Sequence, residues 1–68
     1  MDEERFNQSL RRLLKQFDIT AQREVEKAVR AALEQGTLRG NEVLDARTTM
    51  TVQGLSAPIQ VDGRIELG

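Results

Sequence analysis

The chain has 68 residues and a net charge of −1, from 10 basic and 11 acidic side chains, and it contains neither cysteine nor histidine. This length allows one domain, and a chain this short buries only about 60% of its unfolded surface. The missing residue types exclude disulfide bridges and the usual zinc ligands as reinforcement. We therefore expect packed elements or self-association to supply stability, and we expect no cofactor.

The N-terminal segment MDEERFNQSL is acidic where a secretion signal is basic, and no apolar segment follows it. No run approaches the roughly 20 apolar residues of a membrane span. The near-zero net charge indicates no strong field for nucleic acid or anionic lipid. These features predict a soluble, cytoplasmic protein without a membrane partner.

The first half of the chain predicts two amphipathic helices, over residues 3–17 and 21–35. Apolar residues recur at helical spacing in both segments: Phe6, Leu10, Leu13, Leu14 and Phe17 in the first, and Val25, Ala28, Val29, Ala32 and Leu33 in the second. Residues 18–20 break the pattern between them, with Thr20 as a candidate N-cap and Gly36 as a candidate C-cap. So short a connection predicts an antiparallel helix pair.

The second half changes to a period of two, which is typical of strands. After a loop over 37–46, strands are expected at 47–53, 58–61 and 64–67. A three-residue loop ending in a left-handed Gly63 would keep Ile59 and Ile65 on one face. The predicted fold is therefore α+β, with order α-α-β-β-β: two antiparallel helices packed on one face of a three-stranded antiparallel meander, with its other face in water.

The residue types that the chain lacks exclude most catalytic chemistry. Without histidine or cysteine, the commonest general base and the thiol nucleophile are missing. The segment GTLRG lacks the Lys-Ser/Thr of a phosphate-binding loop. The carboxylates Glu3 and Glu4 are typical of a helix start, and Glu24 and Glu26 lie on different sides of the second helix. We therefore expect no catalytic residues, no metal site and no enzymatic activity.

A basic stripe on the second predicted helix offers an alternative function. Arg23, Lys27 and Arg30 follow one another at helical spacing and could contact phosphates. Glu26 and Glu34 border the same face, and a solvated helix surface carries charges of this kind. Nucleic-acid binding through these three residues is therefore the alternative, and a solvated face is the favoured interpretation.

The strand predicted at 47–53 lies at the edge of the meander and carries a single charge, Arg47. Sheet edges are usually blunted by Lys, Pro or a covering loop, and an open edge accepts a strand from a partner. Thr49, Met50 and Thr51 are therefore candidate contacts with an unknown protein or with a second copy. The competing interpretation is that loop 37–46 covers this edge.

Several short motifs resemble a family of small bacterial proteins known only as a domain of unknown function. They are Phe6-Asn7, Gln22-Arg23-Glu24, Gly40-Asn41-Glu42-Val43-Leu44 and Asp62-Gly63. The resemblance extends over nearly the whole chain. It implies a free-standing domain of the bacterial cytosol and no particular activity. Together with the open edge, it leaves a non-enzymatic protein-interaction or self-associating module as the expected function.

Overall fold

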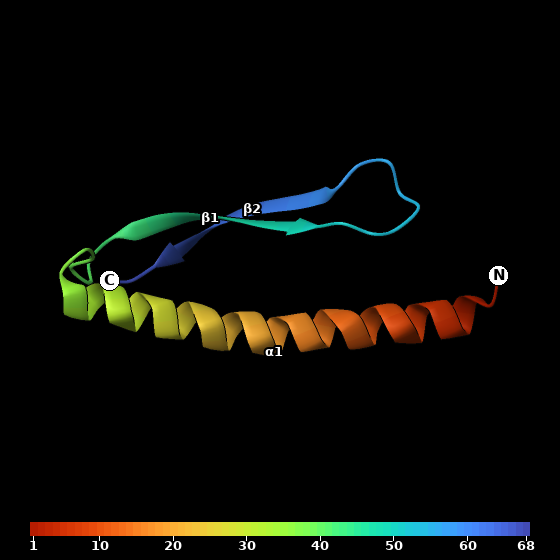
Figure 1. Ribbon diagram of the computed structural model, residues 1–68, viewed down its shortest axis with the longest axis horizontal. Helices are drawn as coiled ribbons and strands as arrows, with labels where there is room; N and C mark the ends of the chain where they lie inside the picture. Colours follow the sequence, from red (N-terminus) through yellow and green to blue (C-terminus); the bar gives the residue numbers. More distant parts are fainter. The chain divides into compact units, whose positions relative to one another are not determined.

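The computed structural model describes residues 1–68 and contains one helix and two strands: α1 (Glu3–Gln35), β1 (Val43–Met50) and β2 (Ile59–Glu66) (Figure 1). The chain divides into a helical unit, Met1–Thr37, and a hairpin unit, Leu38–Gly68. The α+β class predicted from the sequence is confirmed. The number of helices and strands predicted within it is wrong.

Both ends of α1 are capped by the residues around them. The Asp2 side chain accepts a hydrogen bond of 3.0 Å from the backbone N–H of Arg5, which is the usual N-cap bond. At the other end Gly36 has a φ of 82°, and the backbone N–H of Thr37 donates to the carbonyl of Ala32. Glycine adopts this left-handed conformation without steric cost, so the helix ends there.

The predicted break at residues 18–20 does not occur, because α1 runs unbroken from Glu3 to Gln35. No glycine or proline lies within these residues. Each of Asp18, Ile19 and Thr20 costs less than about 0.7 kcal/mol in a helix interior, and such a cost does not end a helix. Thr20 is therefore a mid-helix residue, and the predicted antiparallel helix pair is wrong.

The two strands form one antiparallel hairpin in which each residue of β1 faces one residue of β2. The register runs from Val43 opposite Glu66 to Met50 opposite Ile59. One face is mostly apolar and consists of Leu44, Ala46, Thr48, Met50, Ile59, Val61, Gly63 and Ile65. The other face carries the charged residues of both strands.

The predicted turn at residues 61–63 is wrong, and so is the three-stranded meander. β2 passes straight through Asp62 and Gly63, which face Arg47 and Ala46 across the sheet. Gly63 does not have a positive φ. An uninterrupted strand already places Ile59 and Ile65 on the same face, because both numbers are odd and strand side chains alternate. A turn was therefore not needed to keep the apolar residues together.

The turn lies instead in residues 51–58. Gly54 has a φ of 90°, and the backbone N–H of Leu55 donates to the carbonyl of Val52 at 3.1 Å. A positive φ at the third of four residues is what a type II turn requires, and glycine supplies it. The strand predicted at 47–53 therefore ends at Met50. It begins earlier than expected, since residues 43–46 of the predicted loop belong to β1.

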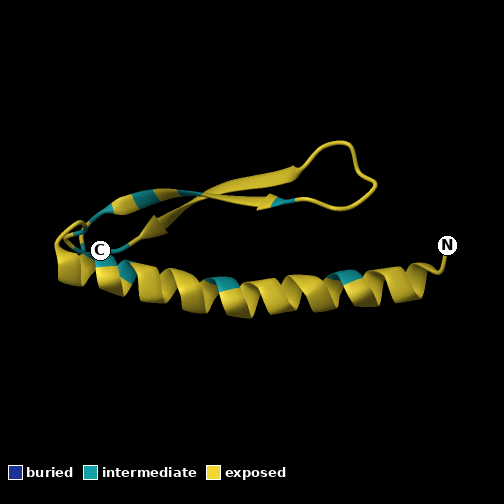
Figure 2. Cartoon of the chain, viewed as in Figure 1, coloured by how far each residue is buried: buried dark blue, intermediate teal, exposed yellow.

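No residue of the chain is buried (Figure 2). The least exposed positions alternate along β1, at Leu44, Ala46 and Met50, while every residue of β2 is exposed. Neither a lone helix nor a two-stranded hairpin builds an enclosed core, since a hairpin alone is marginally stable in water. No stretch of α1 is apolar enough over the necessary length to cross a membrane.

Candidate interaction surfaces

The surface of α1 carries an apolar stripe along its whole length. Its members recur at steps of four, four and three residues and are Phe6, Leu10, Leu14, Phe17, Ala21, Val25, Ala28 and Ala32, with Leu13 beside them. At 100° per residue, those eight fall within an arc of about 100°. Large members are well exposed, with 47% of Phe6 and 50% of Phe17 accessible. We call these nine residues the apolar stripe.

The sequence predicts two helices over this stripe, because Asp18, Ile19 and Thr20 interrupt its apolar spacing. Ala21 joins the halves, since it lies four residues after Phe17 and four before Val25. The signal that could have shown one helix is the unbroken eleven-residue repeat, in which Phe6, Phe17 and Ala28 occupy equivalent positions. Three helical turns span about 10.8 residues, so this repeat stays on one side of a straight helix.

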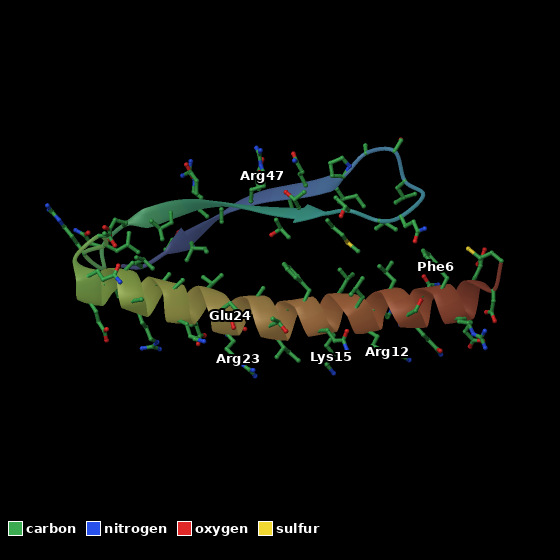
Figure 3. The ribbon with its side chains drawn as sticks, in the orientation of Figure 1. Phe6, Arg12, Lys15, Arg23, Glu24 and Arg47 are labelled. Carbon is green, nitrogen blue, oxygen red and sulfur yellow. The ribbon has the colours of Figure 1, made fainter.

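The predicted phosphate contacts Arg23, Lys27 and Arg30 lie together on the side of α1 away from the stripe. Because the helix is continuous, Arg5 and Arg12 extend this row toward its N-terminus, and the five residues fall within about 60° of one another. Figure 3 shows Arg12, Lys15 and Arg23 on the opposite side of α1 from Phe6. The row is about 38 Å long from Arg5 to Arg30. Glu26 and Glu34 interrupt it at one end.

The charged face of the hairpin carries two ion pairs between facing residues. The guanidinium of Arg47 contacts the carboxylate of Asp62 at 2.7 Å, and that of Arg64 contacts Asp45 at 3.5 Å. All four side chains are more than half exposed, so each pair contributes at most about 1 kcal/mol. Together with Ala46 and Gly63 they line an open depression. Each charge of β1 is thus matched by an opposite charge on β2.

The predicted partner edge is placed in part on β1. Thr49 and Met50 are its last two residues and face Gln60 and Ile59, whereas Thr51 follows the strand. The sheet has only two strands, so β1 pairs on one side and its other edge has no strand beside it. Segment 37–42 makes no backbone hydrogen bond to that edge, since the bond from the Leu67 N–H to the Glu42 carbonyl extends the β1–β2 pairing.

The Glu42 carboxylate organises the segment before β1, which lies within the loop predicted at 37–46. It accepts hydrogen bonds from the backbone N–H of Arg39, at 2.9 Å, and of Gly40, also at 2.9 Å. The Arg39 bond first, and the Gly40 bond second, hold the pKa of Glu42 below its ordinary value of 4.5. Gly40 itself has a φ of 101°. The signal for this arrangement in the sequence is a glycine two residues before a glutamate, Gly40-Asn41-Glu42.

No group of three or more carboxylates lies close enough to hold a metal ion. Glu24 and Glu26 are on different sides of α1, and only Glu26 has a side-chain partner, the amide of Gln22 at 3.2 Å. The surfaces that the chain does present are the apolar stripe, the basic row and the open edge of β1.

The full length of the chain, residues 1–68, matches the model of a family of unknown function, DUF6494. The chain belongs to this family. This membership confirms the resemblance found in the sequence and extends it to both ends of the chain. No curated protein matches the chain, and no solved structure matches it.

Proposed function

We propose that the protein is a non-enzymatic interaction module of the cytoplasm that binds protein, including copies of itself. The observation that carries this proposal is that no residue is buried, although 38% of the chain is hydrophobic. Burial of apolar surface contributes about 25 cal/mol per Å². Contact with another protein surface supplies the burial that neither unit supplies for itself. The cytoplasmic location rests on the sequence alone.

The open edge of β1 supports association by strand addition. Its unpaired N–H and C=O groups can bond an extended segment of another chain. Thr48, Thr49 and Met50 carry no charge that would repel such a segment, and Arg47 is paired with Asp62. The partner strand is that of another protein, or β1 of a second copy across a two-fold axis.

The first test is the mass of the protein in solution, measured by light scattering from low to high micromolar concentration. We expect a mass that rises above the 7.7 kDa of one chain. A strict monomer throughout this range would contradict self-association.

Proline at Thr48 or at Thr49 tests the edge itself. Neighbouring strand residues direct their N–H groups to opposite edges, so one of the two prolines faces the open edge and the other faces β2. The proline that leaves the β2 chemical shifts unchanged is expected to weaken association through the edge. Thr48→Val and Thr49→Val keep both N–H groups and are the matched controls. Undiminished association of the hairpin-preserving proline variant would exclude the edge.

Nucleic-acid binding is the second candidate function, and the continuity of the basic row favours it. Five basic residues along about 38 Å could follow a phosphate backbone more closely than the three predicted from sequence. The net charge of −1 and the bordering acids Glu26 and Glu34 weigh against it. We therefore expect no binding at physiological salt.

Fluorescence anisotropy with labelled DNA and RNA at several salt concentrations separates the two candidates. If the row binds phosphates, affinity falls steeply with salt, and Arg23→Gln reduces the slope of log affinity against log salt by about one. Arg39→Gln, outside α1, serves as the control for loss of one charge. Tight, salt-sensitive binding that depends on Arg23 would place this function first.

A further inference from the structure

The apolar stripe of α1 is divided by side-chain size. Its N-terminal half holds the large members, and its C-terminal half holds the small ones: Phe6, Leu10, Leu13, Leu14 and Phe17 against Ala21, Val25, Ala28 and Ala32. Facing helices pack best when large residues oppose small ones. A surface with this polarity is therefore complementary to itself only when one of the two copies is reversed.

We propose that α1 pairs antiparallel with α1 of a second copy, stripe against stripe. With the two-fold axis level with Ile19, four of the five large residues are level with smaller ones: Phe6 with Ala32, Leu10 with Ala28, Leu13 with Val25, and Phe17 with Ala21. The fifth, Leu14, is level with Glu24. The pairing is isologous, so each contact occurs twice. The stripe remains on the facing side for its whole length of about 39 Å, because its eleven-residue repeat is nearly in phase with a straight helix.

A parallel pair does not fit the same side chains. It stacks Phe6 on Phe6 and Ala28 on Ala28, so that the gap between the helices is filled at one end and empty at the other. Unfilled space of this kind forfeits contact energy along its lining. The size gradient therefore selects the antiparallel arrangement.

The charges on α1 favour the same choice. Glu24 lies inside the arc of the stripe, at the same angle as Phe6. In a parallel pair Glu24 would lie beside its own copy, and like charges in contact repel. In the antiparallel pair the two copies of Glu24 are about 15 Å apart along the helices, so this repulsion is largely removed.

This inference rests on the proposed self-association and names the surface that carries it. The chain has no native cysteine, so single cysteines report distances between copies without interference. Ser9, Thr20 and Ala31 are eleven residues apart and follow one another on the side of α1 between the apolar stripe and the basic row. They form a matched set at the N-terminal end, the centre and the C-terminal end of the interface.

Disulfide formation in these variants is the decisive measurement. We expect Thr20→Cys to form a homodimeric disulfide, because this position lies beside the two-fold axis. Ser9→Cys alone is expected to form none, because its two copies are about 30 Å apart. A mixture of Ser9→Cys and Ala31→Cys chains is expected to form the mixed disulfide. Disulfides in all three single variants would show a parallel pair and overturn the proposal.

A charge placed in the stripe tests the same surface without cysteine. Phe17→Glu is expected to raise the dissociation constant of the dimer by about tenfold or more, as loss of a central aromatic contact does. Gln8→Glu adds the same charge on the opposite side of α1 and is expected to change nothing. Far-UV circular dichroism checks that both variants keep their helix.

The size pairing can be tested in its own right. Ala21→Phe places a second aromatic ring opposite Phe17 of the other copy, where the proposed pairing has room only for a small side chain. This variant is expected to weaken the dimer. Adding Phe17→Ala to this variant exchanges the two sizes and is expected to restore it. A double variant as weak as Ala21→Phe alone would contradict the contact between positions 17 and 21.

Failure of this inference is distinguishable from failure of the proposed function. If the protein associates, ignores Phe17→Glu and loses association on proline substitution in β1, the edge carries the contact and the helix pairing is wrong. If the unmodified protein is a strict monomer, both the helix pairing and self-association are wrong.

Discussion

Single residues decide where the elements of this protein begin and end. Asp2 and Gly36 cap α1, Gly54 forms the hairpin turn, and Glu42 holds the backbone before β1. Each acts through a bond or a backbone conformation that few other residue types supply. Their substitutions therefore have effects whose sign can be stated in advance.

The carboxylate of Glu42 is expected to make the segment before β1 sensitive to acid. Its pKa is lowered because the N–H groups of Arg39 and Gly40 donate to the ionised form. A lowered pKa in the folded state means that the stabilisation is complete above pH 4.5 and is lost as the pH falls through the lowered value. NMR titration of the Glu42 carboxyl should give a midpoint below 4.5.

The amide signals of Arg39 and Gly40 should shift with the same midpoint as the Glu42 carboxyl. In Glu42→Gln, which cannot titrate, these shifts should disappear. Acid-dependent shifts of both amides that persist in this variant would mean that another group controls the segment.

Gly54 and Gly63, both in the hairpin unit, differ in φ and are expected to respond to alanine in opposite directions. Gly54 has a φ of 90°, and a Cβ there would meet no atom within 4 Å, so Gly54→Ala acts through backbone strain alone. The expected cost is about 1–2 kcal/mol. Gly63 lies inside β2 with equal space around it, so Gly63→Ala should gain about 0.5–1 kcal/mol.

Hydrogen exchange of the β1 and β2 amides measures both effects on the hairpin. Gly54→Asn is a useful intermediate, since asparagine tolerates a positive φ better than alanine does. If Gly63→Ala destabilised the hairpin more than Gly54→Ala, the turn would lie at residues 61–63 after all.

At the scale of elements, α1 is longer than its local sequence signals suggest. Asp18, Ile19 and Thr20 are weak helix formers, and Thr20 is a good N-cap residue in isolation. Helix formation is cooperative, so a helix already capped at Asp2 continues through three weak residues more readily than a second nucleus forms. The apolar stripe crosses the same residues without changing side.

The sign of the effect of Thr20→Ala distinguishes one helix from two. In a helix interior this change should stabilise α1 by up to about 0.7 kcal/mol, since alanine is the better helix former. Asp2→Ala removes the bond to the Arg5 N–H and should cost about 0.5–2 kcal/mol. Thermal melts followed by far-UV circular dichroism compare the two. A cost from Thr20→Ala similar to that from Asp2→Ala would indicate a helix start at residue 20.

At the scale of the whole molecule, the dominant fact is that no residue is buried. A folded state without a buried core has little hydrophobic stabilisation to offset the entropy of ordering the chain. Association with a second copy would supply buried surface by mass action. The stability of this protein is therefore expected to depend on its concentration.

The midpoint of thermal unfolding should rise with protein concentration, as measured by far-UV circular dichroism. The dependence should be weaker in Phe17→Glu, whose stripe is interrupted by a charge, and unchanged in Gln8→Glu. A midpoint that is the same at low and high micromolar concentration would show that the single chain is stable by itself.

Much of this fold could be predicted from local pattern. The start of α1 at Glu3, its end at Gln35 and the change to strand periodicity all follow from caps and alternation in the sequence. Three features could not: the continuity of α1 through Thr20, the passage of β2 through Gly63, and the early start of β1 at Val43. The sequence identified part of the basic row and of the β1 edge. The basic row is longer than predicted because α1 is continuous, and the edge ends at Met50 because β1 ends there.

The sequence by itself determined which residues share a face, because alternation and helical spacing are properties of neighbouring residues. It did not determine which strand faces which. The alternation of Ile59, Val61 and Ile65 is the same with a turn at Gly63 or without one, so the local pattern permits both. Only the tertiary structure decided between them, by setting Arg47 opposite Asp62 and Asp45 opposite Arg64. These contacts join residues distant in the chain, and local pattern carries no information on such pairings.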